Sequence, residues 1–448
     1  MAQPRRSPPD RARRLAFDAL RTVNSGGGYA NLVLRGLLDH RRLEPRDAAL
    51  ATELVFGTCR WQGSYDAIIS AAAGKPVHSW QPAAVDLLRL GTHQLMAMRI
   101  PASAAVSATV ELASATVGRR ITGLINAVLR RVATRDLAGW LDELTAGLDD
   151  RDALGLRTAH PRWIVDAYAD LLPPEELEVA LAANNASPRV TLAIRPGFCS
   201  VEELVAAGAQ PCEHSPFGAR WSGNPSELAA VREGRAGVQD EGSQLVAWAL
   251  TRPTAPAGWW LDLCAGPGGK TGLLAGLATS DGSRVLAADV SQHRAALVAS
   301  AVRRYPGALV VAADATRPPW TSGRFTRVMA DVPCTGLGAL RRRPEARWRR
   351  TPKDLDQLCQ LQVRLLTSAL EATSIGGVLG YVTCSPHRQE TSDVVEHVLT
   401  GRSGFELLDP AELLPPLSGA SRGRYVQLWP HRHGTDAMFG ALLRRVGG

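Results

Sequence analysis

The chain has 448 residues, 45% of them hydrophobic and 21% charged, which is enough for about three domains of roughly 150 residues, each with its own core. It has no apolar run of the roughly 18 residues that a membrane span needs, and the basic start MAQPRRSPPDRARR does not resemble a secretory signal, so we expect a cytoplasmic protein. The net charge of +8 favours an anionic partner, with nucleic acid first, although an arginine-rich composition alone would give the same charge. The seven cysteines form no CxxC pair, which argues against a disulfide scaffold or a zinc cluster, so no metal is expected.

Residues 1–10 are expected to form a basic disordered tail, and residues 11–150 an all-α bundle. Apolar residues recur with the spacing of one helix face from Ala12 to Val23 and again from Ile121 to Val132. Further helices are predicted at 29–40, 45–62, 64–73, 82–98 and 102–114.

A change of pattern predicts a small α/β linking subdomain at 154–236. It contains an alternating strand at 189–195, followed by a helix at 201–207.

Residues 237–448 alternate strand and helix, which predicts a Rossmann-like domain with a parallel sheet covered on both faces. The strands are expected at 260–263, 284–288, 309–313, 326–330 and 378–382, with helices such as 292–305 and 355–373 between them. The segments 425–429 and 437–444 are expected to close the sheet as a hairpin.

The stretch WWLDLCAGPGGKT, at 259–271, is a short apolar run, a glycine turn and a helix start. Such a turn lets the backbone approach a ligand closely beside the free N–H groups of a helix N-terminus. The predicted cofactor-binding residues here are Cys264, Ala265, Gly266, Pro267, Gly268, Gly269 and Lys270. A phosphate-binding P-loop would need glycine at position 264, and Pro267 lacks an N–H, so an NTPase is not favoured.

Acidic residues lie at or near the ends of four consecutive predicted strands, where ligands bind in open α/β sheets. Asp289 lies 20 residues after Gly269, an interval at which an acid accepts hydrogen bonds from a ribose diol of either NAD or S-adenosylmethionine. Asp314 is a candidate acceptor for an adenine amino group, and Asp331 ends the fourth strand. A single such residue would more simply be a helix cap, whereas four in register indicate a shared site.

Two cysteines follow the last two parallel strands. Cys334 lies in DVPCTG and Cys384 in YVTCSP, and neighbouring strands would bring both thiols to the crevice that holds the cofactor. The alternative for each is an ordinary buried cysteine, which does not account for two at strand ends beside a cofactor loop.

The segments LDLCAGPGGKT, ADVPCTG and YVTCS resemble the three diagnostic motifs of the S-adenosylmethionine-dependent RNA cytosine-5 methyltransferases. The resemblance extends through GVQDEGSQLVAWAL, RRRPEARWRR and PHRHGTDAMFGALL, while ARRLAFDALRTV and RDAALATELVFGTCRWQ resemble a NusB-like RNA-binding domain. Nearly the whole chain is thus similar to the Sun/Fmu (RsmB) type, which methylates small-subunit (16S) ribosomal RNA. Gly266 and Ala437 depart from the family's commoner Ala and Gly.

The resemblance implies S-adenosylmethionine as cofactor, Cys384 as the nucleophile that adds to C6 of cytosine, and Cys334 as a helper in later steps. Asp331 would accept a hydrogen bond from the cytosine amino group or protonated ring nitrogen, with the base unstacked from the RNA. The basic run after the second motif is a candidate RNA contact, with a solvated basic face as the alternative. Its residues are Arg341, Arg342, Arg343, Arg347, Trp348, Arg349 and Arg350.

Three alternative functions stay open. The same chemistry on transfer RNA is one, although the NusB-like start favours ribosomal RNA. A non-catalytic RNA-binding or ribosome assembly factor is another, although it has no use for Cys334 and Cys384. A Rossmann oxidoreductase would not need the paired thiols either. A monomer is expected.

Overall fold

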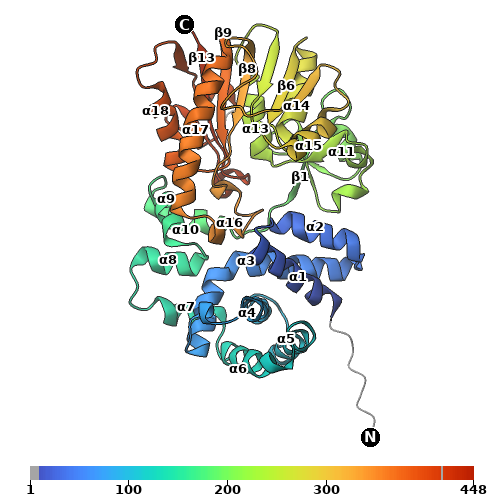
Figure 1. The fold of residues 1–448 in the computed structure, drawn as a ribbon, viewed down its shortest axis with the longest axis vertical. Helices are drawn as coiled ribbons and strands as arrows, with labels where there is room; N and C mark the ends of the chain where they lie inside the picture. The colour runs from blue at the N-terminus through green and yellow to red at the C-terminus, as the bar shows by residue number, and fades with distance from the viewer. Residues whose placement is uncertain (1–9, 415–416, 448) are drawn as a thin grey trace. The chain divides into compact units, whose positions relative to one another are not determined.

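The computed structural model describes residues 10–414 and 417–447, which form two compact units (Figure 1). One unit contains the described residues up to Asp166 together with the segment Arg342–Arg349, and the other contains the rest. The predicted tail at 1–10 lies outside the described residues, apart from Asp10. Among the helices described, none is both long and apolar enough to cross a membrane.

The first unit is all-α over its N-terminal part, as the sequence predicts. Its helices are α1 (Arg11–Gly26), α2 (Ala30–Arg41), α3 (Pro45–Ala73), α4 (Pro82–Met96), α5 (Ala102–Thr116), α6 (Thr122–Val132), α7 (Leu137–Thr145) and α8 (Asp150–Thr158). The apolar faces of α1 and α6 enter one core, in which Leu15, Leu20, Ile125 and Leu129 are buried beside Leu54 of α3. The 3.6-residue spacing seen in the sequence is therefore the face that each helix buries.

The sequence predicts two helices between residues 45 and 73, but the structure has the single helix α3. Gly63 lies inside it, where a Cβ atom would fall 2.3 Å from ring carbons of Trp348. The indole Nε1–H of Trp348 donates to the carbonyl oxygen of Cys59, one turn earlier in α3, at 2.8 Å. Gly63 thus does not break the helix, and its missing side chain makes room for the tryptophan.

The segment Arg342–Arg349 fits among these helices through hydrogen bonds to their backbone. The guanidinium of Arg349 donates to the carbonyl oxygens of Gly27 (2.8 Å) and Gly28 (2.7 Å), just beyond the end of α1. Arg347, which is fully buried, donates to the carbonyl oxygen of Ala159 at 2.9 Å. Cationic side chains at helix ends satisfy carbonyl groups that have no partner within the helix.

The second unit begins with a small antiparallel sheet of order β2-β3-β1-β4, which corresponds to the predicted α/β subdomain. Its elements are α10 (Pro174–Ala183), β1 (Val190–Ile194), α11 (Val201–Ala206), β2 (Gln210–Pro211), β3 (Gly218–Trp221), α12 (Ala229–Arg232) and β4 (Ala236–Val238), and α9 (Arg162–Ala169) spans the unit boundary in the sequence.

The large sheet has the order β11-β12-β13-β9-β8-β5-β6-β7, with β10 paired to β13. Its strands are β5 (Trp259–Asp262), β6 (Arg284–Asp289), β7 (Ala308–Ala312), β8 (Phe325–Asp331), β9 (Thr373–Thr383), β10 (Phe405–Leu407), β11 (Ser421–Arg422), β12 (Tyr425–Gln427) and β13 (Phe439–Arg445). The run from β7 to β9 is parallel, and the antiparallel pair β12–β13 closes the sheet beside β9, as the sequence predicts.

Side chains that alternate along β8 and β9 supply two cores, one on each face of the sheet. Met329 and Val382 pack with α13 (Glu241–Ala249) and α14 (Gly269–Ser280). Val328 and Tyr381 pack with α17 (Pro352–Ala372) and α18 (Ser392–Leu399). α15 (Gln292–Val302) covers β6 and β7 (Figure 1). Helices on both faces leave the ends of the parallel strands as the place for a site.

Gly63→Ala is expected to destabilise the chain by about 1–3 kcal/mol, because the added methyl group overpacks the site of Trp348. The measurement is the unfolding midpoint by calorimetry. Gly36→Ala is the matched control, since Gly36 lies in α2 with nothing within 4 Å of its Cβ position, and it should stabilise by about 0.5–1 kcal/mol. In a Trp348→Ala background the cost of Gly63→Ala should largely disappear; an unchanged cost there would contradict the assigned contact.

Candidate active site

The strand order brings four chemically active side chains to one edge of the large sheet. β6, β5, β8 and β9 are successive parallel neighbours, so their C-terminal ends lie side by side. Asp289 ends β6, Asp262 ends β5, Asp331 ends β8, and Cys384 directly follows β9. The crevice predicted from the sequence is therefore assembled from these four strand ends.

The glycine turn between β5 and α14 is tied to the end of β6. The backbone N–H of Gly266 donates to Oδ2 of Asp289 at 3.0 Å, and a Cβ atom at Gly266 would lie 2.5 Å from that oxygen. Gly268 has φ of 102°, in the region that favours glycine. The guanidinium of Arg294 also lies against Asp289, with Nε 3.4 Å from Oδ2. The loop thus presents the carboxylate of Asp289 beside a closely approachable backbone.

Helix α14 begins directly after this turn. The backbone N–H of Gly272 donates to the carbonyl oxygen of Gly268 at 2.9 Å, so the N–H groups just before it have no acceptor within the helix. Together with the positive end of the helix dipole, they suit an anionic group of a ligand. A nucleoside cofactor with a carboxylate requires three such parts. They are a loop that can approach the ligand, an acid at the next strand end, and a helix N-terminus.

Asp262 lies beneath the turn and is 1% exposed. Burial raises the pKa of its carboxyl to about 7, against the opposing effect of a hydrogen bond from the hydroxyl of Thr271 to Oδ2 at 2.7 Å, and the charges of Asp331 and Asp289 add to the rise. Asp262 is the first of the four strand-end acids that the sequence predicts to share a site, although the sequence assigns it no contact with the cofactor.

Lys270, in the first turn of α14, pairs with Asp331. Its Nζ donates to Oδ2 of Asp331 at 2.9 Å. Burial lowers the pKa of Lys270, but the charge of Asp331 and that of Cys384 outweigh it, so the net direction is upward. Lys270 therefore remains an ammonium ion, and Cys384 lies near enough for their charges to interact.

The two predicted cysteines meet at this ion pair. The Sγ atoms of Cys334 and Cys384 lie 3.4 Å apart. The hydrogen bond with Cys384, followed by burial, raises the pKa of the Cys334 thiol well above its usual range. Cys334 therefore holds its proton strongly, and a hydrogen bond joins the two sulfurs, in which either can be the donor.

The cysteine loops are joined by buried residues that the sequence did not single out. The carboxylate of Glu390, which is fully buried, accepts from the backbone N–H of Thr335 at 2.7 Å and from the side-chain amide of Gln362 at 3.0 Å. Glu390 lies in a short 3₁₀ turn after Cys384 rather than at a strand end. No periodicity or strand-end pattern marks it, and only the tertiary contact reveals it.

Asp314 and Cys264, two of the predicted cofactor-binding residues, differ from the others in their surroundings. Asp314 follows β7, the edge strand next to β6, and its Oδ1 accepts from the N–H (2.9 Å) and hydroxyl (2.7 Å) of Thr316. Its contact with adenine stays a prediction. Cys264 is largely buried, and burial raises the pKa of its thiol, so it contributes shape to the loop rather than a thiolate.

The predicted RNA-contacting run is divided between the two units. Arg341, which is buried, pairs with Asp436 at 3.2 Å within the second unit. In the helical unit the guanidinium of Arg343 stacks on the ring of Tyr29, 4.8 Å from its centroid, and Arg347 is fully buried. Arg341 and Arg347 are buried, and RNA contact through them stays a prediction. The same holds for Arg342, Arg343, Trp348, Arg349 and Arg350.

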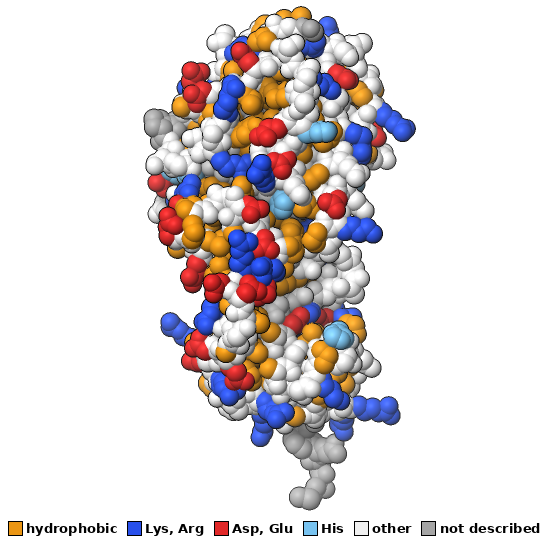
Figure 2. Space-filling model, turned by 90° about the vertical axis from the view of Figure 1, so that its left-hand side faces the viewer, with side chains coloured by type: hydrophobic (Ala, Val, Ile, Leu, Met, Phe, Trp, Pro, Cys, Tyr) orange, Lys and Arg blue, Asp and Glu red, His pale blue; other side chains and the backbone are white. Residues whose placement is uncertain are grey.

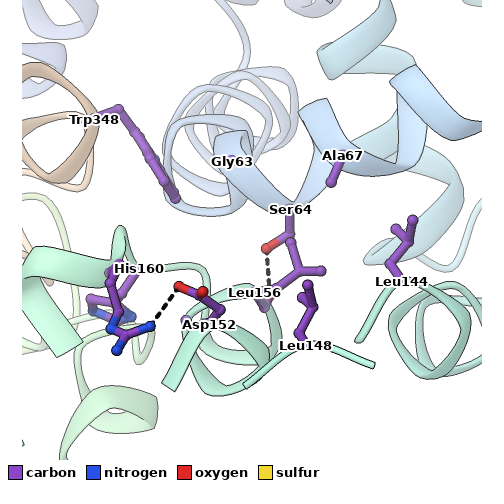
Figure 3. Close-up of a pocket in the computed structure, with 11 residues that line it drawn as sticks. Gly63, Ser64, Ala67, Leu144, Leu148, Asp152, Leu156, His160 and Trp348 are labelled. Carbon is purple, nitrogen blue, oxygen red and sulfur yellow. Dashed lines mark hydrogen bonds and ion pairs between the residues drawn. The ribbon is translucent and has the colours of Figure 1, made fainter. Parts of the chain in front are cut away.

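A separate hollow of about 430 Å³ belongs to the helical unit (Figure 3). Trp348 forms one wall, and Leu144, Leu148 and Leu156 form an apolar side. The hydroxyl of Ser64 donates to the carbonyl oxygen of Leu156 at 2.7 Å.

On the face drawn in Figure 2, Lys and Arg side chains are interspersed with Asp and Glu, so no single basic patch dominates that face. Within residues 10–414 and 417–447, no group of three or more His, Cys, Asp or Glu side chains is arranged to hold a metal ion.

The chain is similar to known proteins over both of its units. Residues 250–444 match the family described as 16S rRNA methyltransferase RsmB/F, and residues 10–134 match the NusB family. A protein of Mycobacterium tuberculosis (strain H37Rv) named as a methyltransferase is 50% identical, over 99% of this chain and 98% of its own length. The ribosomal RNA small subunit methyltransferase B of Pseudomonas putida is 33% identical, over 96% and 98%. The crystal structure of PH0851 shares the fold, with a TM-score of 0.83 and 22% identity over 98% of this chain and all of that one.

Asp262→Asn is expected to flatten the pH dependence of stability. Because the folded-state pKa of Asp262 is raised from 3.8 to about 7, its contribution to stability is fully present below about pH 4 and is lost as pH rises towards 7. Asparagine does not titrate. The free energy of unfolding of the variant should therefore rise relative to that of the wild type, by on the order of a few kcal/mol, between pH 4 and pH 7. Urea unfolding of the ligand-free chain from pH 4 to pH 8 measures the effect, and parallel profiles would contradict it.

Proposed function

The chain belongs to the RsmB/F family of 16S rRNA methyltransferases, and we propose that it transfers a methyl group from S-adenosylmethionine to C5 of a cytosine in 16S ribosomal RNA. The observation that carries the proposal is the pair of thiols, Cys334 and Cys384, 3.4 Å apart beside Asp331 and Lys270. One thiol is held protonated and the other lies near an ammonium ion. This pairing is of use to a reaction that needs both a nucleophile and a proton carrier.

The residues present fit the cofactor. The turn from Cys264 to Lys270 and the carboxylate of Asp289 would hold the nucleoside part, with Asp289 accepting from the ribose hydroxyls. The free N–H groups at the start of α14 suit the cofactor's carboxylate. When bound, S-adenosylmethionine supplies a methyl group on an electrophilic sulfonium. For the ribose hydroxyls to reach Asp289, the side chain of Arg294, half-exposed, must give way.

In the proposed first step the thiolate of Cys384 forms a bond to C6 of the cytosine. The C5–C6 double bond opens, and C5 gains the enamine character that methylation requires. Asp331 accepts a hydrogen bond from the exocyclic amino group or the protonated ring nitrogen, while Lys270 keeps Asp331 in place. The base must first leave the stack of the RNA to reach these groups.

In the second step the C5 proton passes to a base, either water or Cys334 once its own proton has left. The C6–Sγ bond breaks, and the C5–C6 double bond forms again with Cys384 released as a thiolate. Cys334 lies 3.4 Å from the departing sulfur, so it can return a proton to Cys384 after release. The variants below separate this role from that of base for the C5 proton, because only loss of the base leaves the covalent adduct unresolved.

Ribosomal RNA is preferred over transfer RNA because residues 10–134 match the NusB family, an added domain that the chemistry itself does not need. A non-catalytic assembly factor is disfavoured because it gives no reason for two adjacent thiols beside an ion pair. The proposal also includes a cytoplasmic location and a monomeric state.

Cys384→Ala is expected to abolish methyl transfer to 16S RNA while S-adenosylmethionine still binds, since only the nucleophile is lost. Cys334→Ala is expected to leave the covalent RNA adduct unresolved, visible as a slow band on a denaturing gel. Cys359→Ala, a cysteine on α17 outside the pair, is the matched control and should retain activity. Full activity of Cys384→Ala would contradict the nucleophile, and absence of an adduct with Cys334→Ala would contradict Cys334 as the base for the C5 proton.

Asp289→Ala is expected to weaken S-adenosylmethionine binding by about 10-fold or more, because one charge-assisted hydrogen bond is worth about 1.5–3 kcal/mol. Isothermal calorimetry of the RNA-free chain measures it. Asp393→Ala is the control, since Asp393, at the start of α18, pairs with Arg388 in the short turn before that helix. An unchanged dissociation constant for Asp289→Ala would contradict the ribose contact.

A further inference from the structure

We propose that Glu390 is a positioning residue that sets the distance and the protonation of the Cys334–Cys384 pair, an inference that rests on the proposed function. Glu390 does not touch either sulfur in the hydrogen-bond network. It acts through the residues that directly follow each cysteine, Thr335 and Ser385.

The network is a chain of buried hydrogen bonds with one direction. A carboxylate only accepts, so the hydroxyl of Thr335 donates to Oε2 of Glu390. The oxygen of Thr335 is then free to accept from the hydroxyl of Ser385, 3.2 Å away. All three residues are at most 2% exposed, so no solvent competes for these bonds. If Glu390 is removed, Thr335 loses the acceptor of both its N–H and its hydroxyl.

Glu390 is itself fixed from three elements. Its Oε1 accepts from Gln362 of α17 at 3.0 Å, and that same amide donates to the carbonyl oxygen of Pro333 at 2.9 Å. The hydroxyl of Tyr381 in β9 donates to the backbone oxygen of Glu390 at 2.8 Å. The carboxylate thus joins the loop after β8 to the loop after β9 through side chains that are themselves held by hydrogen bonds. The spacing of 3.4 Å between the two sulfur atoms depends on that junction.

The charge of Glu390 has a second effect. The hydrogen bond with Cys384 is the largest cause of the raised pKa of the Cys334 thiol, followed by burial and the charge of Cys384. The charge of Glu390 raises this pKa further. The other groups facing Cys334 include the N–H of Gly336, which acts in the opposite direction. Glu390 therefore supports the protonated state that lets Cys334 donate to Cys384.

Two variants separate these effects. Glu390→Ala removes the junction, whereas Glu390→Gln keeps its size and one acceptor oxygen but removes the charge. Glu241→Gln is the matched control, because Glu241 is also buried and accepts from two backbone N–H groups, those of His214 (2.6 Å) and Ser215 (3.0 Å), away from the cysteine loops.

The first measurement uses phenylarsine oxide on the full chain without RNA. This reagent binds the sulfurs of both Cys334 and Cys384, with loss of water. The wild type should be captured, Cys384→Ala should not, and Glu390→Ala should be captured far more slowly. Single-turnover methyl transfer by Glu390→Ala should fall by on the order of 100-fold, as for a misplacement of about 1 Å, with unchanged affinity for S-adenosylmethionine. Glu390→Gln should recover most of the rate.

The second measurement is the pH profile of iodoacetamide alkylation at Cys334, followed by peptide mass spectrometry. Glu390→Gln should shift it to lower pH, and Glu241→Gln should leave it unchanged. Wild-type rate and capture in a folded Glu390→Ala chain, or an unshifted profile in Glu390→Gln, would overturn the proposal. If the wild type is captured but transfers no methyl group, the proposed function fails and the positioning of the thiols stands.

Discussion

The parallel pairing of β8 with β9 is the constraint on which the candidate site depends. Its register places Asp331 opposite Val382, so the loops that follow the two strands leave the sheet at the same level. Cys334 and Cys384 then meet at 3.4 Å although 50 residues separate them in the chain. A shift of one residue in either strand would exchange the two faces of the sheet and separate the thiols.

Three charged or titratable side chains lie around the two thiols. Lys270 brings a buried ammonium ion, Asp331 balances it at 2.9 Å, and Asp262 lies below with a carboxyl pKa raised to about 7. Below neutral pH Asp262 is largely protonated, so it adds little negative charge beside the Lys270–Asp331 pair.

The parallel strands, the glycine turn and the two cysteines could be predicted from the sequence because each follows a local pattern of apolar alternation, glycine spacing or strand ends. Glu390 could not be predicted, since its importance comes from Thr335 and Gln362, which approach it only in the folded sheet. Gly63 was misread for a similar reason. A glycine within a helical pattern reads locally as a break, and only the contact with Trp348 shows that the position serves close packing.

The run from Arg341 to Arg350 shows why charge alone is a poor guide to a nucleic-acid surface. Its guanidinium groups are used in two different ways within the protein. Arg347 and Arg349 satisfy backbone carbonyl groups in the helical unit, whereas Arg341 neutralises Asp436 in the other. A buried arginine must find such partners, since an unpaired buried charge is costly. The segment that follows the loop of Cys334 therefore has a structural task, and any RNA contact must come from the side chains of the run that this task leaves exposed.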